Sequence, residues 1–502
     1  MILSTLLLLS PAVLPQGETD KDSWTIAVDR LHVGDGRTID DALVTITDGR
    51  ISAVVAGGSG AGALRVDGAH MTPGLVDAFS YMGIDPNTVE ESRESTPSLR
   101  VADSVRLDAP AFGAALREGV TGAFLTPDSL NVIGGLGAMV KTAGGRPADL
   151  FADAGSAAQV IDPAGALKLS LGGDASRGNW TPSGRFTTNY RARRPNTRMG
   201  TVWVIRREFY RAMDYAAARE GGLPVYDADL EVLAQAMRGE VTVRFQARRS
   251  HDVETALRLA EEFSLPSVVI EEGTESHDVT ASLNAKGVPV VTGPAYDSRA
   301  RNIARGPQAI ELRYLASPPA VCCEDLHDVV LAELEGEHGD HDGHAAHAAH
   351  GHHDEETGLM PVSDFVLEQL AALAPRYGAS GYFGGRRVEG QSATPAGAAL
   401  LAADGVPVSL GGAEAHDASL TEASLIHQAR NAVRWGMDPA EALVAVTSRP
   451  AALCGVGDRL GQVAAGYDAD LVVWSGDPLA SSSRPVLVFV DGRLVVDNRT
   501  QD

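Results

Sequence analysis

Histidine is the residue type whose number and spacing in this chain could most directly support chemistry. There are 14 His in 502 residues, and half of them lie within residues 336–356, GEHGDHDGHAAHAAHGHHDEE. Imidazole nitrogens at a spacing of three residues could loosely gather Zn²⁺, Ni²⁺ or Cu²⁺. The segment has no apolar face, so we predict a disordered insertion, and a merely tolerated soluble insertion stays open beside metal capture. Its histidines are His338, His341, His344, His347, His350, His352 and His353.

The other seven histidines are scattered, and none forms a His-x-His pair at the end of a predicted strand. They are His32, His70, His251, His277, His327, His416 and His427. His416, in GGAEAHDAS, directly follows a predicted strand. Zn²⁺ at neutral pH is held by nitrogen, sulfur or carboxylate donors, so a zinc site built mainly from histidines is not expected in this chain outside residues 336–356.

Composition excludes several classes of partner. The formal net charge of −24 argues against nucleic acid and anionic membrane surfaces, which need a basic footprint. Cys322, Cys323 and Cys454 are too few for a disulfide framework, and Cys454 reads as a small buried hydrophobe. No segment is long and apolar enough to predict a membrane span.

The N-terminal residues 1–22 predict a signal peptide and leader. The run ILSTLLLLSPAVL is apolar but too short to span a bilayer, and polar residues follow it. No Lys or Arg precedes the run, and no clear cleavage site follows. We therefore expect an exported protein, periplasmic or extracellular, and a cytoplasmic protein or a lipid-facing anchor stay open.

Both ends of the chain are rich in strand patterns. Apolar and polar residues alternate after Trp24 and again near the C-terminus, and the turns Asp48-Gly49 and Asp491-Gly492 are strong hairpin signals. These patterns predict one small β-sandwich domain composed of residues 23–72 and 455–502.

The middle of the chain, residues 73–454, alternates short apolar runs with amphipathic helical stretches. Examples are VTVRF followed by HDVETALRLAEEF, and PSVVIEE followed by HDVTASLNAKG. This alternation predicts parallel strands with crossover helices. The fold class is therefore α/β, and a (β/α)₈ TIM-like barrel is expected, with an open doubly wound sheet as the alternative.

Several segments resemble the amidohydrolase superfamily. TPGLVDAFSYMG is similar to the run that leads into the first barrel strand, and ALVAVTSRPAALCGVGDRLGQVAAGYDADLVVWSGDPL is similar to the closing helix and strand. NVIGGLGAMVKTAGG, NTRMG and residues 240–294 resemble the imidazolonepropionase-like branch. The resemblance covers most of the chain in family order. It implies a metal-dependent hydrolase of non-peptide C–N bonds, in which one or two zinc ions activate a water molecule.

The positions that the family uses for metal ligands carry other residues here. The first-strand His-x-His corresponds to Phe79 and Tyr81, with Ser80 between them. A phenyl ring cannot ligate a metal, and a phenol is a poor substitute for imidazole. The second His-x-His corresponds to Gln246 and Arg248, and a permanently charged guanidinium would repel a cation.

At the last two ligand positions, residues that can bind a metal lie at the position itself or next to it. Glu272 replaces the histidine of a Glu-His-Gly-Thr-Glu pattern, and Ala413 replaces the aspartate that would accept the proton of the water. A slip of one residue would put Glu414 at the aspartate position. Glu272, Glu414 and His416 could rebuild a single-metal site, although each alone reads as a solvated loop residue.

Four other residues match family positions with lower specificity. Lys141 and Lys168 are both candidates for the lysine that some members carbamylate to bridge two metals. Arg198 in NTRMG and Asn131 in the Gly-rich hairpin match structural or substrate-side positions.

The resemblance and the substitutions together predict a non-catalytic homologue. It would hold a small-molecule ligand in an aromatic-walled barrel mouth, form a homo-oligomer, or associate with an active paralogue, and Arg248 and Glu272 could instead simply pair with each other. The alternative is an active amidohydrolase for a cyclic or linear amide, with zinc in an atypical site.

Overall fold

The computed structural model describes most of the chain. The described residues are 23–57, 60, 62–84, 90, 92–145, 157–173, 175–176, 194–195, 197–293, 396–412 and 424–499. The predicted signal peptide, the His-rich segment, Cys322, Cys323, Ala413, Glu414 and His416 lie outside these residues. Among the described residues, no helix is long and apolar enough to cross a membrane.

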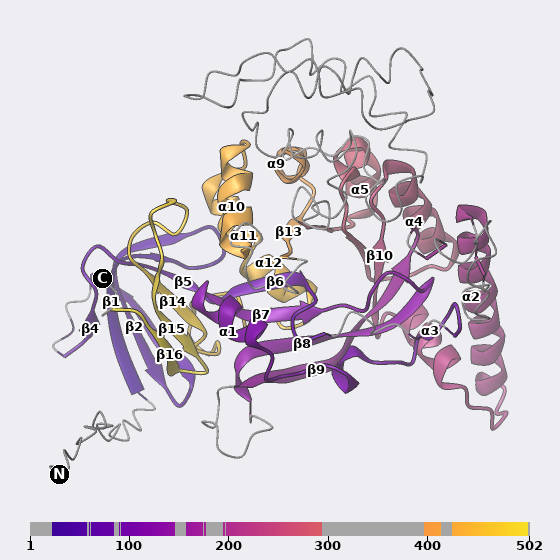
Figure 1. The fold of residues 1–502 in the computed structure, drawn as a ribbon, viewed down its shortest axis with the longest axis horizontal. Coiled ribbons are helices and arrows are strands. Elements are labelled where there is room, and N and C mark those ends of the chain that lie inside the picture. The colour runs from indigo at the N-terminus through magenta and orange to yellow at the C-terminus, as the bar shows by residue number, and fades with distance from the viewer. Residues whose placement is uncertain are drawn as a thin grey trace, which may run out of the picture.

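Strands from both ends of the chain form one eight-stranded sheet, in the order β16-β15-β14-β5-β1-β2-β3 with β4 beside β1. In Figure 1 the indigo strands of the N-terminal part lie beside the yellow strands of the C-terminal part. The strands are β1 Ser23–His32, β2 Thr38–Thr47, β3 Arg50–Ala56, β4 Leu64–Arg65, β5 His70–Pro73, β14 Leu471–Trp474, β15 Pro485–Val490 and β16 Arg493–Asp497. The two ends of the chain thus build one β domain, as expected, and its strands belong to a single hydrogen-bonded sheet.

The two predicted hairpin turns connect β2 to β3 and β15 to β16. Asp48 and Gly49 have φ of 52° and 77°, and Asp491 and Gly492 have φ of 48° and 74°. Positive φ at both central residues matches the twist of antiparallel strands.

The second eight-stranded sheet is the barrel, in the order β13-β12-β11-β10-β9-β8-β7-β6. Its strands are β6 Leu75–Ser80, β7 Val120–Leu125, β8 Ile133–Gly145, β9 Ala157–Ser170, β10 Thr242–Gln246, β11 Val268–Glu271, β12 Val290–Thr292 and β13 Val408–Leu410. The helices are α1 Pro110–Arg117, α2 Arg198–Glu220, α3 Ala228–Arg238, α4 Ser250–Glu262, α5 Thr280–Lys286, α9 Gly397–Ala403, α10 Leu425–Arg434, α11 Pro439–Val444 and α12 Ser448–Leu453. The expected α/β barrel is therefore present.

One part of the barrel departs from the expected alternation of parallel strands and helices. β8 runs antiparallel to both β7 and β9, and no helix lies between these strands among the described residues. Antiparallel neighbours need no crossover helix, because the chain can reverse in a short connection. The glycines of β8 also allow close packing: a Cβ at Gly137 would lie 2.5 Å from the Phe124 ring.

The first and last barrel strands meet without pairing directly. The carboxylate Oδ1 of Asp77 on β6 accepts the Gly412 amide at 2.8 Å. The amide of Val76 on β6 donates to the Val446 carbonyl, and the amide of Leu410 on β13 donates to the Ala445 carbonyl. The turn after α11 thus accepts a backbone hydrogen bond from each of the two edge strands. These contacts bring the two ends of the sheet together.

Candidate functional site

The inner face of the barrel carries charged side chains. On β9, β10 and β11 apolar residues of the main core alternate with Lys168, Arg244 and Glu271. Alternation with period two turns these three side chains to the face opposite that core. Arg244 Nη2 donates to the Ala78 carbonyl at 2.5 Å, and Ala78 lies on β6, four strands away in the sheet order. The Arg244 side chain therefore crosses the barrel interior.

Glu271 links two cations inside this space. Its Oε2 lies 2.5 Å from Arg244 Nε, and its Oε1 forms an ion pair with Lys168 and accepts a hydrogen bond from Thr126 at 3.2 Å. All four side chains are at most 1% exposed. Desolvated charges are tolerated only when they are paired and hydrogen-bonded, and these contacts supply both.

The aromatic pair expected at the first-strand positions is present. Phe79 is the second-last residue of β6 and Tyr81 directly follows the strand, and their ring centroids lie 5.3 Å apart in an edge-to-face arrangement. The Lys168 ammonium lies 5.1 Å from the Phe79 ring centroid, within the range of a cation–π contact. Phe79 and Tyr81 are 2% and 3% exposed, so most of their surface is already covered by protein.

Arg248 and Glu272 form an ion pair at the ends of adjacent strands. The side-chain amide of Gln246 donates to Glu272 Oε2 at 3.4 Å, and Ser129 Oγ donates to Oε1 at 3.5 Å. Glu272 has φ of 57°, a left-handed conformation that is uncommon for a residue with a side chain. Strain of this kind persists only where surrounding contacts fix the backbone. Three of the expected site residues, Gln246, Arg248 and Glu272, thus meet at the Glu272 carboxylate.

Comparison with known proteins agrees with this barrel. Residues 335–495 match the model of the amidohydrolase family. The chain carries an amidohydrolase-family domain. The amidohydrolase tasK of Hapsidospora irregularis is 26% identical over 459 residues, which cover 86% of this chain and 37% of that relative. The crystal structure of an amidohydrolase from Thermotoga maritima MSB8 has a TM-score of 0.65 at 24% identity, covering 94% of this chain and 99% of that one, which supports the fold. The imidazolonepropionase-like branch stays a prediction.

The described residues at the family's metal positions do not fit a divalent ion. A zinc site needs at least three nitrogen, sulfur or carboxylate donors converging on one point. In the part of the chain that the structure describes, the one group of three such donors belongs to the β domain. At the barrel mouth Arg248 is a permanent cation beside Glu272, and Lys168 occupies a carboxylate oxygen of Glu271. Of the described acids at these strand ends, Glu271 and Glu272 are therefore each paired with a cation of the chain itself.

The two lysine candidates have different surroundings. Lys168 lies at the strand ends beside Phe79, where a bridging lysine would be expected, but its ammonium pairs with Glu271. Lys141 on β8 instead contacts three carboxylates at the junction with the β domain, so it is not part of the barrel mouth.

Asp77 is a buried acid that the sequence patterns did not single out. Its Oδ1 accepts the amides of Phe79 at 3.0 Å and Gly412 at 2.8 Å. Burial raises the pKa of Asp77 to about 7, against the lowering effect of these amides and of Arg244. The feature of the sequence that could have pointed to Asp77 is its place as the aspartate of the TPGLVDAF run.

Arg198 and Asn131 have structural contacts. Arg198, the first residue of α2, forms a two-pronged ion pair with Asp252 of α4, with Nε–Oδ1 at 2.9 Å and Nη2–Oδ2 at 3.0 Å. The Asn131 side-chain amide is buried and donates to the Glu90 carbonyl and to Thr96 Oγ1, both at 3.0 Å. Arg198 therefore connects two helices, and the buried Asn131 connects two loop segments.

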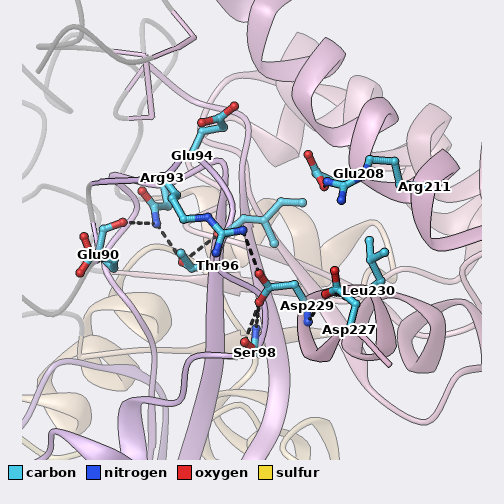
Figure 2. A network of polar contacts seen from close by, with 12 residues as sticks. Glu90, Arg93, Glu94, Thr96, Ser98, Glu208, Arg211, Asp227, Asp229 and Leu230 are labelled. Atoms are coloured by element: carbon cyan, nitrogen blue, oxygen red, sulfur yellow. Dashed lines mark hydrogen bonds and ion pairs between the residues drawn. The ribbon is translucent and has the colours of Figure 1, made fainter. Parts of the chain in front are cut away.

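A charged cleft lies against the outer side of the barrel, between the loop around residues 93–98 and helices α2 and α3. Figure 2 shows its acidic and basic side chains facing one another. The cleft has a volume of about 450 Å³ and is lined by Arg93, Glu94, Ser95, Arg194, Arg207, Glu208, Arg211, Asp227, Asp229 and Leu230. Arg93 pairs with Asp229 at 3.1 Å and Arg207 with Glu94 at 2.9 Å. Because opposite charges pair across it, the cleft selects for neither sign of ligand.

Proposed function

We propose that this chain is a non-catalytic member of the amidohydrolase superfamily, acting as a binding or partner protein. The observation that carries the proposal is the ion pair between Arg248 and Glu272 at two positions where the family resemblance implies metal ligands. A guanidinium at this place repels a divalent cation and occupies the oxygen that could bind it.

The interior charges support the same proposal. Hydrolysis by this superfamily depends on a metal that lowers the pKa of a bound water molecule. In this barrel the described acids at the strand ends are paired with Lys168, Arg244 or Arg248, so they satisfy cations of the chain. These described acids therefore neutralise cations of the chain and are not available to hold a divalent metal.

The role left for such a protein is recognition. Phe79 and Tyr81 provide aromatic surface, and Gln246 and Arg248 provide hydrogen-bond donors near it. A small polar ligand with an apolar part is the class of molecule that fits this set, and it would reach the two rings only over the 2% and 3% of their surface that is exposed. Association with an active paralogue or with a second copy, and export from the cell, remain part of the proposal.

The alternative, an active hydrolase, needs a metal bound by Glu272, Glu414 and His416. Glu414 and His416 lie outside the described residues, and Glu272 would have to exchange Arg248 for the metal. This exchange gives the alternative a specific test.

Metal analysis of the purified full-length protein tests the proposal. We expect no tightly held zinc that depends on the barrel. Zinc content is measured after dialysis against a weak chelator, in the wild-type chain, in a chain lacking residues 336–356, and in that chain with His32→Gln and His70→Gln added. One or two zinc ions per chain that survive all of these changes and disappear with Glu272→Gln would overturn the proposal.

A further inference from the structure

Two histidines and an aspartate meet in the β domain, far in sequence from one another. His32 ends β1, and His70 begins β5, its parallel neighbour, in which His70 pairs in register with Arg30. Asp477 follows β14, the antiparallel neighbour of β5, in which Trp474 pairs with His70. Residues two apart on a strand share a face, so His32 and His70 face the same side.

The distances between these side chains suit a shared metal ion. His32 Nε2 lies 3.1 Å from His70 Nδ1, and one ligand atom from each of the three residues lies within 4.8 Å of the others. Tetrahedral zinc with bonds of about 2.0–2.1 Å separates its ligand atoms by roughly 3.4 Å. The imidazoles are therefore almost at ligand spacing, and the exposed Asp477 needs only a side-chain adjustment to complete three donors.

The imidazoles are also in the protonation state that a metal requires. Burial, and then the charge of His70, lower the pKa of His32 to about 4. Burial likewise lowers the pKa of His70 from its ordinary value. Metal binding needs neutral imidazole, so no proton has to be displaced at neutral pH.

The surrounding charges do not oppose a cation. Arg30, the nearest cation in sequence, pairs with Asp40 at 2.7 Å, and Asp29 adds a further carboxylate nearby. Asp477 Oδ1 accepts the Leu479 amide at 2.9 Å, which fixes its loop and leaves Oδ2 for another partner.

We propose that His32, His70 and Asp477 bind one divalent transition-metal ion of the zinc class. Two imidazoles and one carboxylate match the donors that such ions prefer over Mg²⁺ or Ca²⁺. Because the three residues come from β1, β5 and the loop after β14, the ion ties the N-terminal and C-terminal parts of the β domain together. The site shares no residue with the barrel mouth, so it holds whether or not the barrel is catalytic.

Cobalt titration of the metal-free full-length protein tests the site, because four-coordinate Co²⁺ has visible absorption bands that loosely bound ions lack. We compare the wild type with the His32→Gln/His70→Gln double variant and with Asp477→Asn. The matched control is His251→Gln, since His251 is exposed beside the carboxylate of Asp252 but has no second imidazole beside it among the described residues. Thermal unfolding with and without Zn²⁺ is measured on the same four proteins.

We expect one equivalent of the cobalt signal, and a rise of the Tm with Zn²⁺, in the wild type and the control. The double variant should lose both, and Asp477→Asn should weaken binding at least tenfold. Should the double variant misfold, Asp477→Asn decides, because an exposed loop residue with an isosteric side chain leaves the sheet intact. Titration curves that are unchanged in these variants would assign the metal to the His-rich segment and overturn the proposal.

Discussion

Glu271 is the side chain on which the charge balance of the barrel interior depends. It faces Arg244 and Lys168 at once, and it is fully buried. A single carboxylate between two cations is stabilised by both, and it is the negative charge with which each of these buried cations pairs. Removing the carboxylate therefore leaves two desolvated positive charges close together.

Glu271→Gln should destabilise the protein by about 3–5 kcal/mol, the range for breaking a buried ion pair from one side. Urea unfolding followed by circular dichroism measures the change. The matched control is Glu261→Gln, because Glu261 pairs with Lys286 at 2.7 Å on the surface. Exposed pairs contribute little, so the control should behave like the wild type. Equal losses in the two variants would contradict the interior network.

At this scale the sequence indicated which ligand types were missing, but not what replaced them. Phe79 and Arg248 stand out because they occupy positions in a family motif. Glu271 and Arg244 lie inside apolar strand patterns and have no distinctive spacing. Their pairing depends on strands brought together by the barrel, which a local pattern does not contain.

At the scale of elements, the junction of β6 and β13 is where the barrel closes. Asp77 accepts two amides there, from Phe79 and Gly412. Gly411 permits this approach, because a Cβ at that position would lie 2.6 Å from the Phe79 Cβ. The barrel thus closes through a glycine directly after β13, which leaves room for Phe79, and a buried aspartate on β6, which accepts the Gly412 amide.

The stability that this junction provides should depend on pH through Asp77. Burial raises the pKa of Asp77 to about 7 in the fold, from an ordinary value of 3.8. The folded chain therefore holds the proton more tightly than the unfolded chain. The resulting stability is complete below about pH 4 and is lost as the pH rises through about 7, by at most about 1.4 kcal/mol per pH unit.

Asp77→Asn should remove this dependence, because an amide keeps an oxygen for the two backbone donors and does not titrate. The free energy of unfolding of wild type and variant is measured by urea unfolding from pH 5 to pH 8. We expect the wild type to lose stability relative to Asp77→Asn as the pH rises. A constant difference between the two proteins across this range would exclude Asp77 as the titrating group.

Elements were predictable where local chemistry fixes them. The turns at Asp48-Gly49 and Asp491-Gly492 followed from residues that tolerate positive φ. The reversed direction of β8 could not be predicted, because a buried strand shows the same apolar run whether its neighbours are parallel or antiparallel. Its direction is decided by the partners β7 and β9.

At the scale of the whole molecule, Lys141 joins the barrel to the β domain. Its ammonium lies 3.0 Å from Asp468 and 3.1 Å from Asp470 and also contacts Asp491, and Lys141 itself is 1% exposed. Burial by itself would lower the pKa of Lys141, but these carboxylates raise it, so the charge is kept. One cation from β8 thus neutralises acids that all come from the C-terminal part of the chain.

Lys141→Met should therefore destabilise the protein by about 3–5 kcal/mol, since it leaves the buried Asp470 carboxylate without its cation, whereas Asp468 keeps its ion pair with Arg459. Burial already raises the pKa of Asp470 to about 6, and losing Lys141 would raise that pKa further. At a pH above this raised pKa, the folded variant has to keep Asp470 charged and desolvated without a cation. The loss of stability in Lys141→Met should therefore be larger at pH 8 than at pH 5.

Urea unfolding of Lys141→Met at both pH values measures this loss, with Lys286→Met as the matched control. Lys286 pairs with Glu261 on the surface, so its replacement should change stability by less than about 1 kcal/mol at either pH. A loss in Lys141→Met that is the same at pH 5 and pH 8 would mean that packing of the lysine stem, and not its charge, connects the barrel to the β domain. The expected dependence on pH instead follows from acids of the last 35 residues meeting a lysine of the barrel, a contact that requires both parts to be folded and in place.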